Sequence, residues 1–136
     1  MRKIAKALII DGEGKVLVLY RSDSHPHFAR HLDFPGGIVE LNELAADAVA
    51  REIYEEAGIT IKQTDLKLIH EETMPSGKIC MLYSCTIKSE RPIVKISWEH
   101  GHSEWLTTGQ IINTPMPEKV DDYFEMVVRY LRSAIA

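Results

Sequence analysis

Apolar residues along this chain form short runs rich in Ile, Val, Leu and Tyr, separated by clusters of Gly, Pro, Asp and Ser. Short apolar runs between turn signals are typical of β-strands. We therefore expect strands at residues 4–10, 16–20, 66–74, 79–87 and 103–106. Residues 11–14 and 75–78 carry the Gly and Pro of turns, and we expect each to join two neighbouring strands.

Two other segments carry apolar residues at the three- and four-residue steps of a helix with one buried face. The first follows the Pro35-Gly36-Gly37 break and contains no Gly or Pro from residue 41 to residue 57. Gly58 suits the left-handed cap that ends many helices. The second segment covers residues 117–135 and is expected to form a closing helix.

The order of these elements predicts an α/β protein, with a mixed sheet between helices in one domain of residues 1–136. Residues 21–30 are polar and are expected to form a loop, and residues 90–95 a linker or an edge segment. Hydrophobic residues make up 45% of the chain and charged residues 26%, which is ordinary for a soluble globular protein.

Charge and hydropathy exclude some classes of function. The formal net charge of −4 argues against a nucleic-acid polymer as partner, but metal ions can supply the local positive charge that a phosphate substrate needs. No apolar run approaches the roughly 20 residues of a membrane span. The first six residues lack the apolar core of a signal peptide, so we expect a cytoplasmic protein.

Candidate chemistry lies in the first helical segment. Glu52, Glu55 and Glu56 stand at i, i+3 and i+4 and project from one helical face. Like charges at these spacings cost roughly 0.2–0.5 kcal/mol per pair in an isolated helix. Arg51 can pair with Glu55, and a hard divalent cation such as Mg²⁺ or Mn²⁺ suits the remaining carboxylates. The alternative is an ordinary solvated acidic face.

The segment 37–59 resembles the Nudix hydrolase signature at every defined position. These positions are Gly37, Glu43, Arg51, Glu52, Ile53, Glu55, Glu56, Gly58 and Ile59. Residues 32–37 resemble the stretch that usually leads into this signature, while Asn42 stands where the family commonly has Gly. The resemblance implies an α/β/α sandwich around a mixed β-sheet. It also implies a MutT-like pyrophosphatase that hydrolyses nucleoside diphosphates linked to another moiety.

The resemblance also implies roles for the residues of the signature. The principal metal ligands would be Glu52, Glu55 and Glu56. The loop around Gly36 and Gly37 would add a backbone carbonyl ligand. Arg51 would orient the glutamates, and Glu43 would support them or bind the metal through water.

The general base stays open between two kinds of carboxylate. A glutamate of the signature, Glu55 or Glu56, is one option. A glutamate of a later loop, Glu99 or Glu104, is the other, unless both are surface residues. We prefer Glu99 of the later pair, because Glu99-His100 followed by Trp105 resembles the family's downstream segment.

The sequence says less about which residues contact a substrate than about which residues bind a metal. Arg21 follows a strand and could reach a phosphate, and Phe34 or Tyr83 could stack on a base unless they pack in the core. The histidines of the loop before the signature could bind a metal or line a substrate loop. They are His25, His27 and His31.

The sequence leaves open which substrate is cleaved and which class of function the chain has. The substrates compatible with the resemblance are dNTPs, ADP-ribose, dinucleoside polyphosphates and nucleotide sugars, and a homodimer is a reasonable expectation for a soluble protein. One alternative is a catalytically silent module that binds nucleotides or proteins, although such a module would be expected to have lost carboxylates that this chain keeps. A second alternative is a nucleotide-sugar hydrolase that attacks the sugar carbon.

Overall fold

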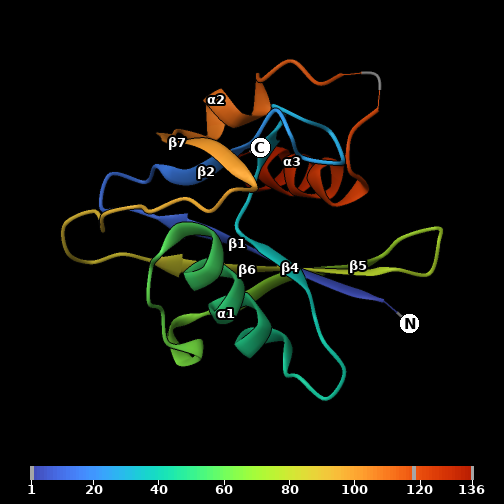
Figure 1. Ribbon diagram of the computed structural model, residues 1–136, viewed down its shortest axis with the longest axis horizontal. Coiled ribbons are helices and arrows are strands. Elements are labelled where there is room, and N and C mark those ends of the chain that lie inside the picture. The colour runs from blue at the N-terminus through green and yellow to red at the C-terminus, as the bar shows by residue number, and fades with distance from the viewer. Residues whose placement is uncertain (1, 118, 136) are drawn as a thin grey trace.

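The computed structural model describes residues 2–117 and 119–135, which form a mixed β-sheet with helices on both faces (Figure 1). The strands run in the order β3-β2-β1-β6-β5, while β4 pairs with β1 and β7 pairs with β2. Their bounds are β1 Lys3–Ile10, β2 Val16–Arg21, β3 Leu32–Asp33, β4 Gly36–Ile38, β5 Lys67–Thr73, β6 Ile79–Thr86 and β7 His100–Leu106. The helices are α1 Ala45–Ala57, α2 Thr108–Ile112 and α3 Asp122–Ile135, with a short 3-10 turn at Gln63–Asp65.

The sheet opens between the neighbouring strands β1 and β2. In the described part of the chain, β1 pairs with β2 only where Ile10 faces Val16. Away from that point β2 pairs with β3 and β7, while β1 pairs with β4 on one side and runs parallel to β6 on the other. The short segment from β3 to β4 therefore crosses from one half of the sheet to the other.

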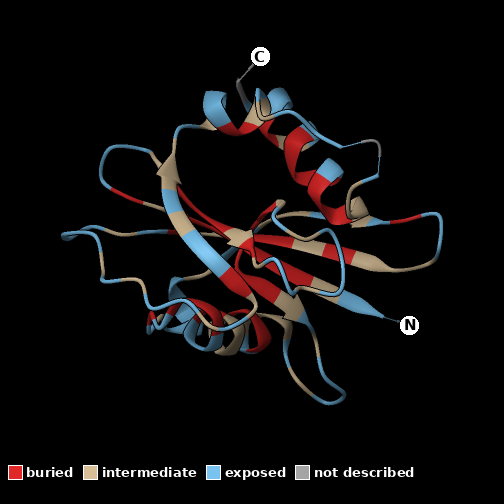
Figure 2. Ribbon diagram, turned by 45° about the horizontal axis from the view of Figure 1, so that its top comes forward, coloured by how far each residue is buried: buried red, intermediate tan, exposed pale blue. Residues whose placement is uncertain are grey.

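Two hydrophobic cores lie on the two faces of the sheet (Figure 2). Alternation along β1 divides its side chains between them, because successive residues of a strand point to opposite faces. Leu8 packs with Phe124 of α3, whereas Ile9 packs with Ile53 of α1. The sandwich of helix, mixed sheet and helix that the sequence predicted is therefore confirmed.

The five predicted strands are present, with some different ends. The last of them begins at His100 rather than at residue 103, and Arg21 ends β2 rather than beginning the loop. The first helix begins at Ala45 because Leu44 keeps an extended backbone (φ −73°, ψ 143°). The closing helix begins at Asp122, five residues later than expected from residue 117.

Four short elements have no counterpart in the prediction, and one of them is the 3-10 turn at Gln63–Asp65. Strands β3 and β4 contain two and three residues, which is too short for a period of two to be visible. Helix α2 had a signal, since Thr107 and Gln110 form a capping box at its start. None of the helices in the described residues is long and apolar enough to cross a membrane.

Gly36 is needed where the segment crosses the sheet. Its φ is +133°, and a Cβ at this position would lie 2.2 Å from the carbonyl oxygen of Ala5. We expect Gly36→Ala to lower the free energy of unfolding by more than about 2 kcal/mol, since backbone strain and a backbone clash combine. Gly14→Ala is the control, because φ is +80° there but the surrounding space is open. It should cost about 1 kcal/mol.

Urea unfolding measures the loss of stability in both variants from the transition midpoint. The comparison requires that the slope of the free energy of unfolding against urea concentration is the same in both. Equal losses in the two variants would mean that the close approach at Gly36 has no energetic consequence.

Candidate active site

Helix α1 brings two of its three glutamates out of solvent. Glu56 is only 5% exposed, and its Oε1 accepts a hydrogen bond of 2.8 Å from the backbone N–H of Gly36. Burial raises the pKa of Glu56 to about 8 and also raises the pKa of Glu52. Glu55 stays more exposed. An ordinary solvated acidic face is therefore the wrong description of Glu52 and Glu56.

Arg51 holds the carboxylates of this helix in place. Its Nε and Nη2 donate to the two oxygens of Glu43 at 2.9 and 3.0 Å. Its Nη1 donates to Glu52 at 3.0 Å and to Glu55 at 3.4 Å. Hydrogen bonding to Glu43 is the main reason that the pKa of Arg51 is raised, and it lowers the pKa of Glu43. The expected pairing of Arg51 with Glu55 is thus present, but Glu43 is its strongest partner.

The backbone at Gly36 and Gly37 lies directly against these carboxylates. A Cβ at Gly37 would stand 2.9 Å from the carboxyl carbon of Glu52, so a side chain at this position would displace that carboxylate. The carbonyl oxygen of Gly36 accepts a hydrogen bond of 3.0 Å from Lys6 Nζ.

The three glutamates of α1 line one cavity of about 480 Å³, which we call the carboxylate cavity. Its lining residues are Lys6, Arg21, His25, Asp33, Gly36, Gly37, Ile38, Glu40, Glu52, Glu55, Glu56 and Glu99. Glu99 thus reaches this cavity from the loop between β6 and β7. Glu104 does not line it, and instead binds Tyr20 and His102 on another part of the surface.

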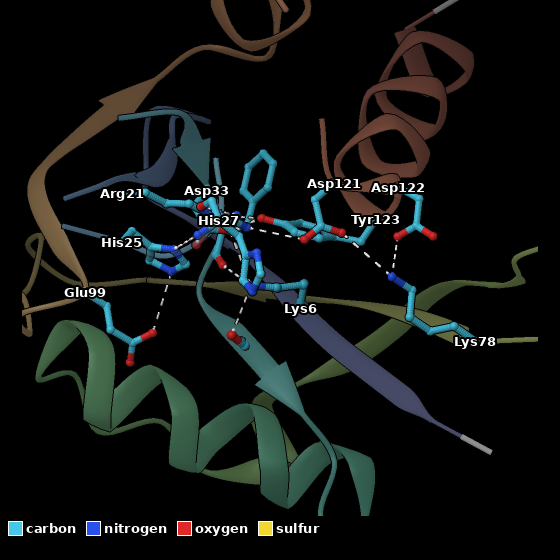
Figure 3. Close-up of polar contacts among 12 residues, drawn as sticks. Lys6, Arg21, His25, His27, Asp33, Lys78, Glu99, Asp121, Asp122 and Tyr123 are labelled. Atoms are coloured by element: carbon cyan, nitrogen blue, oxygen red, sulfur yellow. Dashed lines mark hydrogen bonds and ion pairs between the residues drawn. The ribbon is translucent and has the colours of Figure 1, made fainter. Parts of the chain in front are cut away.

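A buried carboxylate that the sequence analysis missed fills the opening in the sheet (Figure 3). Asp33 Oδ1 accepts from Lys6 Nζ at 3.3 Å and from Tyr123 Oη, and its Oδ2 lies 2.9 Å from His100 Nε2. Arg21 Nε lies 3.3 Å from Oδ2. Burial alone would raise the pKa of Asp33, but Lys6, His100 and Arg21 outweigh it and hold that pKa well below its usual range.

Arg21 and Lys6 also line a second cavity of about 540 Å³, which we call the neighbouring cavity. Its wall includes Phe28, Lys78, Asp121 and several residues of the carboxylate cavity. The residues common to both cavities are Lys6, Arg21, His25, Gly37 and Ile38. The two spaces therefore adjoin, and a ligand longer than one cavity can extend from one into the other.

The other substrate candidates lie in different environments. Phe34 is completely buried and stacks on Phe124, so its predicted role as a platform for a base is wrong. Tyr83 also lies in a core, under α1. Arg21 is only 6% exposed, and its Nη1 donates to the carbonyl oxygen of His27.

The three loop histidines are also divided between a cavity and the core. His25 and His27 line the neighbouring cavity, whereas the ring of His31 packs edge-on against Phe124. Lys6 and Asp33 had one signal in the sequence. Each is a charged residue within or beside an apolar run.

The residues of the carboxylate cavity fit a hard divalent cation. Within residues 2–117 and 119–135, no three Asp, Glu, His or Cys side chains are grouped closely enough to hold an ion by themselves. Mg²⁺ does not require such a group, because it usually binds one or two carboxylates together with waters and substrate phosphates. The desolvated oxygens of Glu52 and Glu56 are suitable donors, and Glu55 stands at the same cavity.

The raised pKa of Glu56 predicts a pH-dependent loss of stability without metal. Between the unfolded pKa of 4.5 and the folded value of about 8, the unfolded chain releases a proton that the folded chain keeps. Stability should therefore fall as pH rises through this window. In EDTA, raising the pH from 5 to 8 should therefore stabilise Glu56→Gln by about 2 kcal/mol relative to the wild type. Urea unfolding at the two pH values measures this difference, and parallel pH curves would contradict the assignment.

Comparison with known proteins agrees with this geometry. The NUDIX domain family matches residues 1–127. A MutT-like protein of Streptomyces ambofaciens is 27% identical over 104 residues, which are 76% of this chain and 62% of that protein. An 8-oxo-dGTP diphosphatase of Escherichia coli K12 is 41% identical over 84 residues, which are 61% of this chain and 65% of that protein. The matches thus span less than two thirds of the length of these curated relatives.

Solved structures show the same fold over nearly the whole chain. The MutT protein from Methanosarcina mazei Go1 superposes with a TM-score of 0.69 at 26% identity, over 98% of this chain and 94% of that one. A MutT NUDIX hydrolase from Burkholderia pseudomallei superposes with a TM-score of 0.69 at 23% identity, over 94% and 95%. With the family match over residues 1–127, these comparisons establish that the chain belongs to the Nudix family.

Proposed function

We propose that this chain is a divalent-metal-dependent hydrolase that cleaves the pyrophosphate bond of a nucleoside diphosphate linked to another moiety. The observation that carries this proposal is the carboxylate cavity, where desolvated glutamates adjoin a space of about 540 Å³. Cavities of this size are typical of small-molecule sites. Mg²⁺ is the cation we propose first, and Mn²⁺ the alternative, because both prefer oxygen donors.

The cation would be held by Glu52, Glu55 and Glu56, with the backbone at Gly37 as a further donor. When bound, it supplies positive charge that neutralises the pyrophosphate oxygens and makes a water more acidic. Arg51 keeps the carboxylates in register through its bonds to Glu43 and Glu52.

A carboxylate at the edge of the cavity then takes the proton of the attacking water. Glu99 is the residue we propose for this step, because it lines the cavity from a separate loop. The water oxygen forms a bond to phosphorus as the bridging P–O bond breaks. The electron pair of that bond leaves with the departing phosphate group, which takes a proton from solvent.

Nucleoside triphosphates are the first substrates to test. The E. coli relative that is 41% identical over 84 residues is an 8-oxo-dGTP diphosphatase. The neighbouring cavity offers the exposed ring of Phe28 beside cationic and acidic side chains, which suits a nucleoside with polar edges. ADP-ribose, dinucleoside polyphosphates and nucleotide sugars remain the other members of the panel. A cytoplasmic location and a homodimer stay predictions from the sequence.

The test is hydrolysis of a panel of these four classes with Mg²⁺ or Mn²⁺, with the products separated by chromatography. We expect a nucleoside monophosphate product from at least one class and no product in EDTA. Glu55→Gln should lower kcat by about 100-fold or more, because it removes a charged oxygen at nearly constant volume.

Glu71→Gln is the matched control, since Glu71 is exposed on the edge strand β5 and should leave kcat unchanged. Bound nucleotide without any turnover would contradict the proposal and indicate a silent binding module. Release of a free sugar from a nucleotide sugar would indicate attack at the sugar carbon.

A further inference from the structure

His25 and Glu99 approach one another from two loops that are tied to the same residue. The N–H of Ser22 donates to the carbonyl oxygen of Glu99 at 2.9 Å, and the carbonyl oxygen of Ser22 accepts from the N–H of His25 at 3.1 Å. Both side chains line the carboxylate cavity. Figure 3 shows the His25 ring directed toward the Glu99 carboxylate, with 3.9 Å between Nε2 and Oε2.

The backbone selects the form of the His25 ring that can donate to Glu99. The N–H of His27 donates to His25 Nδ1 at 3.1 Å, so Nδ1 must be without a proton. A ring in that state carries its proton on Nε2, the atom that faces Glu99. Burial lowers the pKa of His25, and the charge of Arg21 lowers it further, so the ring is neutral near pH 7.

A neutral donor suits a carboxylate that must accept a proton. A cation this close would stabilise the charged carboxylate and weaken it as a base. A neutral N–H instead restrains its orientation with a smaller loss of basicity. Glu99 needs such a restraint, because its side chain is 41% exposed and has no hydrogen bond to another side chain among the described residues.

We propose that His25 is a positioning residue that holds the Glu99 carboxylate at the carboxylate cavity. The inference rests on the proposed function, in which Glu99 takes the proton of the water that attacks phosphorus. At 3.9 Å, His25 Nε2 and Glu99 Oε2 are beyond hydrogen-bonding distance, and we expect the bond to form in the substrate complex, where catalytic hydrogen bonds shorten. His25 exchanges no proton with the substrate.

Charged and titratable groups surround His25 on several elements. Arg21 comes from β2, Asp33 from β3 and His100 from β7, and Glu99 immediately precedes that strand. The rings of His25 and His100 lie 6.5 Å apart. Asp33 already engages Arg21 and His100, so Glu99 is the acidic partner that His25 faces without competition from those two groups.

The first test is a double-mutant cycle of His25→Ala and Glu99→Gln on the substrate that the wild type hydrolyses. Glu99→Gln should lower kcat by about 100-fold, and His25→Ala by about 10-fold with KM little changed. If His25 acts through Glu99, the double variant should be no slower than Glu99→Gln alone. Multiplication of the two single effects would overturn the proposal, as would a change confined to KM.

Two further variants separate positioning from folding. His25→Gln keeps a neutral donor and should recover most of the activity lost in His25→Ala. His70→Ala removes another histidine, which lies 3.3 Å from Glu72 on β5, and should leave kcat unchanged. The acid limb of the kcat–pH profile should shift in His25→Ala but not in His70→Ala, and equal profiles would count against positioning of the base.

The second test does not depend on turnover. Nitrogen NMR of the His25 ring should show the neutral Nε2–H form at pH 7, with a resonance that moves in Glu99→Gln. The Nδ1–H form, or no response to Glu99→Gln, would overturn this proposal even if the enzyme is active. A wild type that hydrolyses no panel member would overturn the proposed function and, with it, the role of His25 in catalysis.

Discussion

The carboxylate of Asp33 connects the two halves of a sheet that the backbone leaves open. Beyond Ile10 and Val16, strands β1 and β2 diverge, and cations from each side meet at this one acid. Removing one partner of such a buried pair typically costs 3–5 kcal/mol, because the remaining charge loses its compensation. Lys6 and Arg21 are therefore fixed in position, and both form part of the wall that the two cavities share.

The electrostatic environment of the glutamates on α1 is the opposite of that of Asp33. Asp33 has more cationic partners than it needs to stay charged, whereas Glu56 is buried without enough of them and its pKa rises to about 8. Arg51 does not correct this, because its hydrogen bonds go to Glu43, Glu52 and Glu55. A divalent cation would supply the missing charge. The unfavourable electrostatics of the α1 glutamates and their proposed affinity for metal thus have one cause.

The sequence predicted the fold and the helix of carboxylates because both depend on local patterns. Alternation of apolar residues located the five main strands, and fixed spacing located Glu52, Glu55 and Glu56 on α1. The contacts that complete the site are not local. Asp33 and Lys6 are 27 residues apart, and His100 joins them from β7, so no window of sequence contains the cluster.

Phe34 shows the limit of reasoning from residue type. An aromatic residue beside a glycine loop suits a ligand or a core equally well, and only the position of α3 decides between them. Lys6 offered a better signal, because a lysine inside an apolar strand requires a buried partner. The partner itself could be identified only once β3 and β4, too short for any pattern, had been placed across the opening.

The proposed mechanism depends on attack of water at phosphorus in the carboxylate cavity. Hydrolysis in ¹⁸O-labelled water, with mass spectrometry of both products, tests it most directly. We expect one ¹⁸O atom per turnover, bound to phosphorus in one of the phosphate products, and we expect its incorporation to require the divalent cation. Label on a sugar carbon, or turnover that persists without the cation, would contradict it.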